Sequence, residues 1–69
     1  MPESAYKIIE LVGTSASSWE DAARNAVEKA GGTLHDLRIA EVGKLDMTIE
    51  DGMVKYYRAR VKVSFRLED

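Results

Sequence analysis

The 69-residue sequence predicts an α+β fold, in which a three-stranded antiparallel sheet partly wraps around one helix. Residues 19–30 carry apolar side chains with the period of an amphipathic helix. An apolar segment, residues 5–12, precedes this helix, and two long segments, residues 37–49 and 53–67, follow it with the composition of strands. The expected order is therefore strand, helix, strand, strand. Because the sequence contains no repeat and no linker, residues 1–69 are expected to form a single domain.

Residues 5–12 form the first predicted strand, and Pro2 and Gly13 bound it. Its large apolar residues are Tyr6, Ile8, Ile9, Leu11 and Val12. The helix is expected to begin after Ser17, because Ser17 and Glu20 have the spacing of a capping box. Its apolar face after Trp19 consists of Ala22, Ala23, Ala26, Val27 and Ala30. The pair Gly31-Gly32 predicts a left-handed end to the helix.

The last two strands are expected to form a hairpin, because Asp51-Gly52 is typical of a tight turn. Gly43 interrupts the first of them and predicts a bulge or a bend. We expect a three-residue turn that includes Met53, since this turn places Leu45, Met47 and Ile49 on the same face as Tyr57 and Ala59. The other face of the last strand carries Tyr56, Arg58, Arg60, Lys62, Ser64 and Arg66.

The composition predicts a folded chain with a thin core. Hydrophobic residues make up 45% of the sequence, but the apolar face of the helix is mostly alanine. Ordering costs about 1.5 kcal/mol per residue, roughly 100 kcal/mol for this length, and burial in one small chain barely offsets that cost. Without cysteine, and with His35 as the single histidine, neither disulfides nor zinc can stabilise the fold. We therefore expect the chain to be stabilised by oligomerisation.

Several functional classes are disfavoured. No apolar run approaches the roughly 20 residues that span a bilayer, and the N-terminal residues lack the layout of a signal peptide, so we expect a cytoplasmic protein without a membrane partner. A net charge of −2 gives no overall attraction for nucleic acid. His35 beside Asp36 is best interpreted as solvated, and no nucleophile and base can be paired, so we expect no enzyme. Gly13-Thr14-Ser15 lacks the other residues of a phosphate loop and is interpreted as an ordinary turn.

Two sets of residues are candidates for binding. Asp46, Glu50 and Asp51 offer oxygen ligands to a cation such as Ca²⁺, although a solvated hairpin tip is the favoured interpretation. The basic stripe of the last strand indicates either an anion or nucleic-acid surface, or pairing with Glu10, Glu41 and neighbouring chains, and we favour pairing. The stripe consists of Arg58, Arg60, Lys62 and Arg66.

Three motifs resemble the dodecin family over essentially the whole chain: ELVGTS at residues 10–15, AEV at residues 40–42 and VKVSFRLE at residues 61–68. The resemblance implies the strand-helix-strand-strand fold. It also implies assembly into a hollow homododecamer, built of trimers in tetrahedral symmetry, in which many members of the family store flavin.

The same resemblance argues against flavin here. Flavin-binding dodecins place a tryptophan and a glutamine where this chain has Ile39 and Arg58. Isoleucine has no π face, and losing one stacking contact costs roughly 1–3 kcal/mol by analogy with nucleobases. Trp19 cannot replace that contact, because it lies in the first turn of the predicted helix. As an alternative, flavin could still bind if Arg58 and Arg60 held its phosphate or the polar edge of its ring.

Arg38-Ile39-Ala40, residues 17–20 and Tyr57-Arg58 are more similar to a mycobacterial branch of the family described as calcium dodecins. The expected function is thus a dodecin-like binding or storage protein, with calcium as the implied ion and a ligand-free structural shell as a further alternative. The residues expected to bind a ligand are Arg38, Ile39, Arg58 and Arg60.

Overall fold

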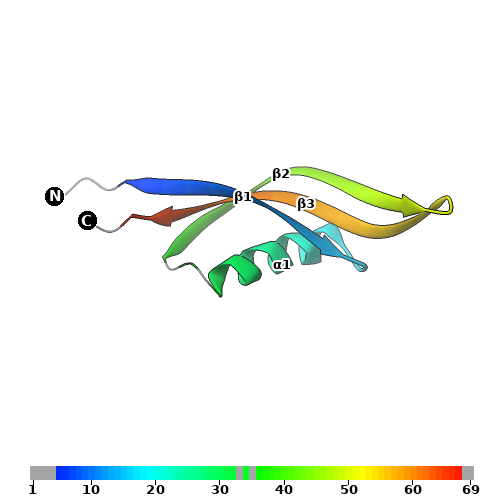
Figure 1. Cartoon of the computed structure of the whole chain (residues 1–69), viewed down its shortest axis with the longest axis horizontal. Helices are drawn as coiled ribbons and strands as arrows, with labels where there is room; N and C mark the ends of the chain where they lie inside the picture. Colours follow the sequence, from blue (N-terminus) through cyan, green and yellow to red (C-terminus); the bar gives the residue numbers. More distant parts are fainter. Residues whose placement is uncertain (1–4, 33, 35, 68–69) are drawn as a thin grey trace.

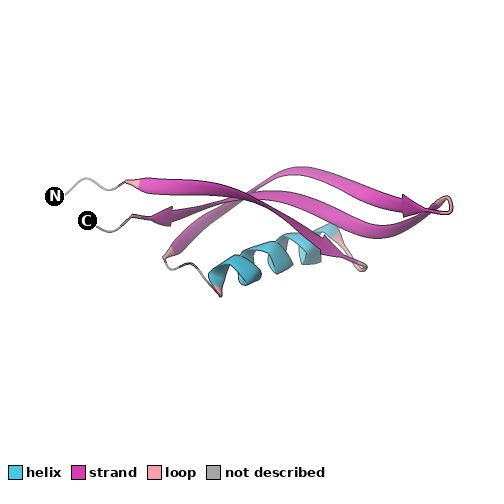
Figure 2. Ribbon diagram, in the orientation of Figure 1, coloured by secondary structure: helices cyan, strands magenta, loops and turns pink. Residues whose placement is uncertain are grey.

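The computed structural model describes residues 5–32, 34 and 36–67. It contains strand β1 (Tyr6–Ser15), helix α1 (Trp19–Gly31), strand β2 (Leu37–Glu50) and strand β3 (Met53–Arg66) (Figure 1). The three strands form one antiparallel sheet, and α1 lies along one of its faces (Figure 2). The predicted fold class and element order are confirmed. No helix in the described part of the chain is long and apolar enough to cross a membrane.

β3 is the central strand of the sheet, whose order is β1-β3-β2. β1 pairs with β3 from Tyr6 opposite Arg66 to Ser15 opposite Tyr57, whereas β2 pairs with β3 as far as the turn. The turn end of the β2-β3 hairpin therefore extends beyond both β1 and α1 (Figure 1). We refer to residues 45–57 as the hairpin end. The molecule is elongated, with extents of 55 × 20 × 13 Å.

The core lies between the alanine face of α1 and the central strand β3. It consists of Ala22, Ala26, Ala59, Val61 and Val63. β1 lies close against this helix at Gly13. A Cβ at this position would lie 2.0 Å from the main-chain oxygen of Ala22, so the approach requires glycine. Small side chains on both elements allow this close approach, and the largest fully buried side chains are therefore only valines.

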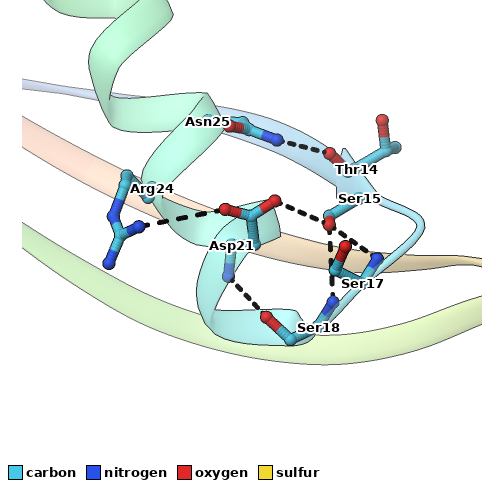
Figure 3. Close-up of polar contacts among 7 residues, drawn as sticks. All are labelled: Thr14, Ser15, Ser17, Ser18, Asp21, Arg24 and Asn25. Carbon is cyan, nitrogen blue, oxygen red and sulfur yellow. Dashed lines mark hydrogen bonds and ion pairs between the residues drawn. The ribbon is translucent and has the colours of Figure 1, made fainter.

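Helix α1 begins one residue later than predicted. Ser18 is the N-cap, and its hydroxyl accepts a hydrogen bond from the Asp21 main-chain N–H at 3.0 Å. Ser17 instead donates its main-chain N–H to Ser15 Oγ at 2.9 Å, while Ser15 Oγ donates to Asp21 Oδ2, also at 2.9 Å (Figure 3). Because the buried Ser15 hydroxyl already binds the Ser17 N–H and the Asp21 side chain, Ser18 and not Ser17 caps the helix.

The predicted left-handed end of the helix is wrong. Gly32 has a φ of −72°, in the right-handed region, and its N–H donates to carbonyl oxygens of the last turn. Among the residues that the structure describes, positive φ is found at Asp36, Asp51 and Gly52, at 59°, 54° and 76°. Asp51 and Gly52 are the central residues of the hairpin turn, where the tight two-residue type requires this conformation.

The hairpin turn has two residues, so the expected three-residue turn is wrong. The additional residue is Lys55, which bulges from β3 between the pairs Thr48 with Tyr56 and Ile49 with Val54. This bulge has the same effect on register as a longer turn: it places Leu45 and Met47 opposite Ala59 and Tyr57, on the helix side, as predicted.

A second bulge lies at Gly43, where the sequence predicts a bulge or a bend. Val42 is opposite Val61 and Lys44 is opposite Arg60, so Gly43 is the extra residue of β2. Between Ile39 and Gly43 the even-numbered residues of β2 therefore face the helix, and after Gly43 the odd-numbered residues face it.

Candidate functional site

The face of the sheet opposite α1, here called the open face, carries the polar residues of all three strands. Directly opposed residues of neighbouring strands project to the same side, so these residues form rows across the sheet. From β1 through β3 to β2 the rows are Ile8, Ser64 and Ile39; Glu10, Lys62 and Glu41; Val12, Arg60 and Lys44; and Thr14, Arg58 and Asp46.

Asp46 and Arg58 form a two-pronged ion pair on this face. Arg58 Nε lies 2.7 Å from Asp46 Oδ1, and Arg58 Nη2 lies 2.9 Å from Asp46 Oδ2. The hydrogen bond from Arg58 holds the pKa of Asp46 below its usual value, aided by the positive charges of Arg58 and Arg60 and opposed by desolvation. The same hydrogen bond raises the pKa of Arg58. Both oxygens of Asp46 are thus occupied by Arg58.

On the helix side of the sheet, Trp19 contacts the segment of β2 that contains Asp46. Its indole Nε1–H donates to the main-chain oxygen of Asp46 at 3.0 Å. Its ring meets Tyr57 edge to face, with 5.1 Å between the ring centroids and 70° between the planes. Trp19 therefore joins the first turn of α1 to the start of the hairpin end. It does not lie on the open face with Ile39.

The three metal candidates do not form a cluster within one chain. Asp46 is bound to Arg58, and Glu50 Oε1 lies 2.9 Å from Lys55 Nζ. Asp51 is exposed in the turn. Among residues 5–32, 34 and 36–67, no three acidic or histidine side chains are grouped closely enough to hold a metal ion. A calcium site that uses these residues would need further ligands.

The four residues expected to bind a ligand are spread along the sheet. Ile39 is 68% exposed and borders a hollow of about 220 Å³ on the open face, which is lined by Ile8, Ile39, Glu41, Lys62 and Ser64. Arg38 is the extra residue of a bulge at the start of β2, and its Nη2 lies 3.9 Å from Asp36 Oδ1. Arg60 and Arg58 occupy later rows. The structure thus brings only Ile39 of the four to the hollow.

The predicted pairing of the basic stripe is found for one residue, with a different partner. Arg58 pairs with Asp46, not with a glutamate. Lys62 lies opposite both Glu10 and Glu41, but within the described residues it makes no ion pair shorter than 4.0 Å. Gly13-Thr14-Ser15 ends β1, and the Ser15 hydroxyl is used inside the turn. His35 lies outside the described residues.

The Asp46–Arg58 pair was not predicted, although the sequence contains a signal for it. Counting back from a strict two-residue turn places Arg58 opposite Leu45, whereas one extra residue moves it to Asp46. The preference for keeping Leu45 and Met47 on the apolar face requires that extra residue. The apolar pattern of β2 therefore already favours an acid opposite Arg58.

The fold defines a class: small α+β proteins with one helix on a long three-stranded sheet. The dodecin family model matches residues 5–68, and the chain belongs to the dodecin family. It is 41% identical over 64 residues to the calcium dodecin of Mycobacterium tuberculosis, covering 93% of this chain and 90% of that protein. It is 42% identical over 64 residues to the dodecin of Thermus thermophilus, covering 93% of each.

Solved structures agree with this assignment. The dodecin of Streptomyces coelicolor is 40% identical, with a TM-score of 0.93 over 100% of this chain and 99% of that one. The crystal structure of the Mycobacterium tuberculosis calcium dodecin, described as having a novel calcium-binding site, is also 40% identical, with a TM-score of 0.84 over 93% of this chain and 91% of that one.

Proposed function

We propose that this protein is a binding or storage protein that works as a closed homododecamer, built of trimers in tetrahedral symmetry, and that it is not an enzyme. The observation that carries the proposal is the large apolar surface that one chain leaves exposed on both sides of its sheet. On the helix side this surface includes Leu45, Met47 and Ile49, and on the open face it includes Ile8, Val12 and Ile39. A core whose largest fully buried residues are valines favours burial of these side chains against further copies.

We propose calcium, and not flavin, as the ligand. The 41% identity to a protein named calcium dodecin supports this choice. So does the aliphatic side chain of Ile39 in an exposed position, because it offers no ring for stacking. Arg58 is held by Asp46 and is not free to meet a ring edge. Asp46, Glu50 and Asp51 are the candidate ligands; in this proposal Ca²⁺ displaces Arg58 from Asp46 and Lys55 from Glu50, and oxygen atoms of neighbouring chains complete the site.

A second candidate, flavin binding, is favoured by one observation, the hollow beside Ile39. Its volume of about 220 Å³ is below the ~300–1,000 Å³ typical of small-molecule pockets, so two copies would have to complete it. In this alternative Arg60 would hold the flavin phosphate. A ligand-free structural shell is the third possibility. In each case we propose a cytoplasmic protein whose partners are other copies of itself and a small ligand, with no nucleic acid and no membrane.

One preparation tests these alternatives together. The protein is purified without added cofactor, desalted, and measured by native mass spectrometry and elemental analysis. We expect twelve chains, a colourless solution and retained calcium. A yellow preparation, or submicromolar quenching of riboflavin fluorescence, would support the flavin candidate instead. An assembly with no retained metal or organic mass would support the structural shell.

The candidate calcium ligands can be tested with a matched pair of variants. Asp51→Asn removes a charge at a residue with positive φ, a conformation that asparagine also tolerates. Asp36→Asn makes the same change at the other aspartate with positive φ, outside the candidate set. By calorimetric titration with Ca²⁺, we expect Asp51→Asn to weaken binding at least tenfold and Asp36→Asn to leave it unchanged. Equal affinities in both variants would remove Asp51 from the site.

A further inference from the structure

Two positive side chains lie directly opposite each other on the open face. Lys44 of β2 is the register partner of Arg60 of β3, and both residues are exposed. Like charges at opposed positions of neighbouring strands destabilise a sheet. The third residue of the row, Val12 of β1, is apolar and exposed, so the row itself contains no acid.

The neighbouring rows offset this pair only in part: the charge of Arg60 also acts on Asp46, and the row of Glu10, Lys62 and Glu41 holds one acid more than its single base. On one side, Asp46 has both carboxylate oxygens bound to Arg58. On the other side, Glu10 and Glu41 lie opposite Lys62. Within the part of the chain that the structure describes, neither Lys44 nor Arg60 makes an ion pair shorter than 4.0 Å. The open face is locally positive, although the chain carries a net charge of −2.

The bulge at Gly43 puts Lys44 and Val42 on opposite faces of the sheet. In an unbroken strand Lys44 would follow Val42 onto the helix side, but the extra residue turns it to the open face opposite Arg60. β-bulges commonly redirect a side chain beside a functional site. The surface above the bulge is open, because a Cβ at Gly43 would meet only the Arg60 main-chain oxygen, at 3.7 Å.

We infer that Lys44 and Arg60 form a binding site for a phosphate-class oxyanion on the open face. Arginine offers a planar fork of donors that fits phosphate oxygens, and lysine adds a compact charge. The ligand is either free inorganic phosphate or the phosphate group of a larger molecule. This inference goes beyond the proposed calcium function and holds or fails independently of calcium binding, although it shares Arg60 with the flavin candidate.

The first test is a titration with inorganic phosphate in Tris chloride buffer at low ionic strength, followed by calorimetry and by thermal unfolding. We expect saturable binding by the wild-type protein and a rise in Tm beyond that produced by sodium chloride at matched ionic strength. Lys44→Gln and Arg60→Gln should each weaken binding at least tenfold. Lys7→Gln, which makes the same change at an exposed lysine whose partner Phe65 faces the helix side, should bind like the wild type.

A charge reversal supplies the second test. Lys44→Glu places an acid opposite Arg60, so we expect a higher Tm than wild type in phosphate-free buffer and no response to phosphate. If this variant does not fold, the two glutamine variants still carry the test. Titration with phenyl phosphate identifies the source of the phosphate: tighter binding than inorganic phosphate indicates a larger ligand, and equal binding indicates the free anion.

Three results would overturn the inference. One is the absence of saturable phosphate binding by the wild type. Another is an equal response of wild type and Lys44→Gln, which indicates a general salt effect or an adventitious ion only. The third is a lower assembled mass of Lys44→Gln in native mass spectrometry without any phosphate binding by the wild type, which indicates that an acid of a second copy neutralises the pair.

Discussion

Two regions of the sheet, the part that α1 covers and the hairpin end, show the same alternation of polar and apolar residues. They differ in how far their apolar residues are buried. On the helix side, Ala59, Val61 and Val63 are at most 1% exposed. On the same side of the hairpin end, Leu45, Met47 and Ile49 are 50%, 42% and 68% exposed. The larger side chains thus lie where the chain has nothing to cover them. The difference separates residues that fold one chain from residues available for other copies.

We expect the largest effect from placing a side chain between β1 and the helix, where they are in close contact. Gly13→Ala should destabilise the chain by at least about 3 kcal/mol, at or above the upper end of ordinary overpacking, because its Cβ would collide with the Ala22 main-chain oxygen. Urea denaturation followed by circular dichroism measures this loss. Gly43→Ala is the matched control and should stay within about 1 kcal/mol of wild type, since its Cβ would meet only ordinary contacts. Equal losses would show that the close approach at Gly13 is not required.

Truncating one aliphatic side chain in each region sharpens the comparison. Val61→Ala leaves a cavity in the core and should cost about 2 kcal/mol, measured by urea denaturation, without changing the assembled mass. Ile49→Ala removes a side chain exposed in the single chain, so it should preserve the helical circular dichroism signal but lower the assembled mass in native mass spectrometry. Reversed results would mean that the hairpin end is not an interface.

A smaller effect is expected at the junction of the two regions. Trp19→Phe keeps an aromatic ring beside Tyr57 but loses the donor to the Asp46 main-chain oxygen. The cost should be about 1 kcal/mol, measured by thermal unfolding, because one neutral hydrogen bond is lost. Trp19→Leu should cost more, since it also loses the ring contact. If Trp19→Phe unfolds at the wild-type temperature, the hydrogen bond does not hold the hairpin end.

The smallest expected effect is a dependence on pH from Asp46. Its pKa is lower in the folded state than in the unfolded chain, so the pair with Arg58 stabilises the fold above the unfolded value, near 3.8. That contribution is lost as the pH falls through the lower, folded pKa. Urea denaturation at pH 7 and below pH 3 should show a slightly smaller loss on acidification for Asp46→Asn than for wild type. An identical loss would show that the pair contributes nothing measurable.

Much of the fold could be predicted from the sequence, because the deciding signals are local. The alanine face of the helix, the Asp51-Gly52 turn and the break at Gly43 each depend on a few neighbouring residues. The helix start could not be decided locally, because Ser17 and Ser18 each have an acid three residues later. The choice between them depends on Ser15, whose hydroxyl binds both the Ser17 N–H and the Asp21 side chain.

The candidate site was harder to predict because it depends on register. The Asp46–Arg58 pair and the opposed charges of Lys44 and Arg60 lie between two bulges, and they depend on a one-residue shift that Lys55 of β3 introduces and Gly43 of β2 reverses. A propensity for a bulge can be recognised at a glycine but not at Lys55. The metal candidates Asp46, Glu50 and Asp51 are close in sequence, yet the strand geometry directs them to different neighbours.

Because of its position, Trp19 is an intrinsic fluorescence probe of the hairpin end. It is the only tryptophan in the chain, and it contacts the hairpin end through both Asp46 and Tyr57. Its fluorescence therefore reports whether the hairpin end is attached to the helix. Emission that changes before the helical circular dichroism signal during denaturation would identify detachment of the hairpin end as a separate step, in unlabelled protein.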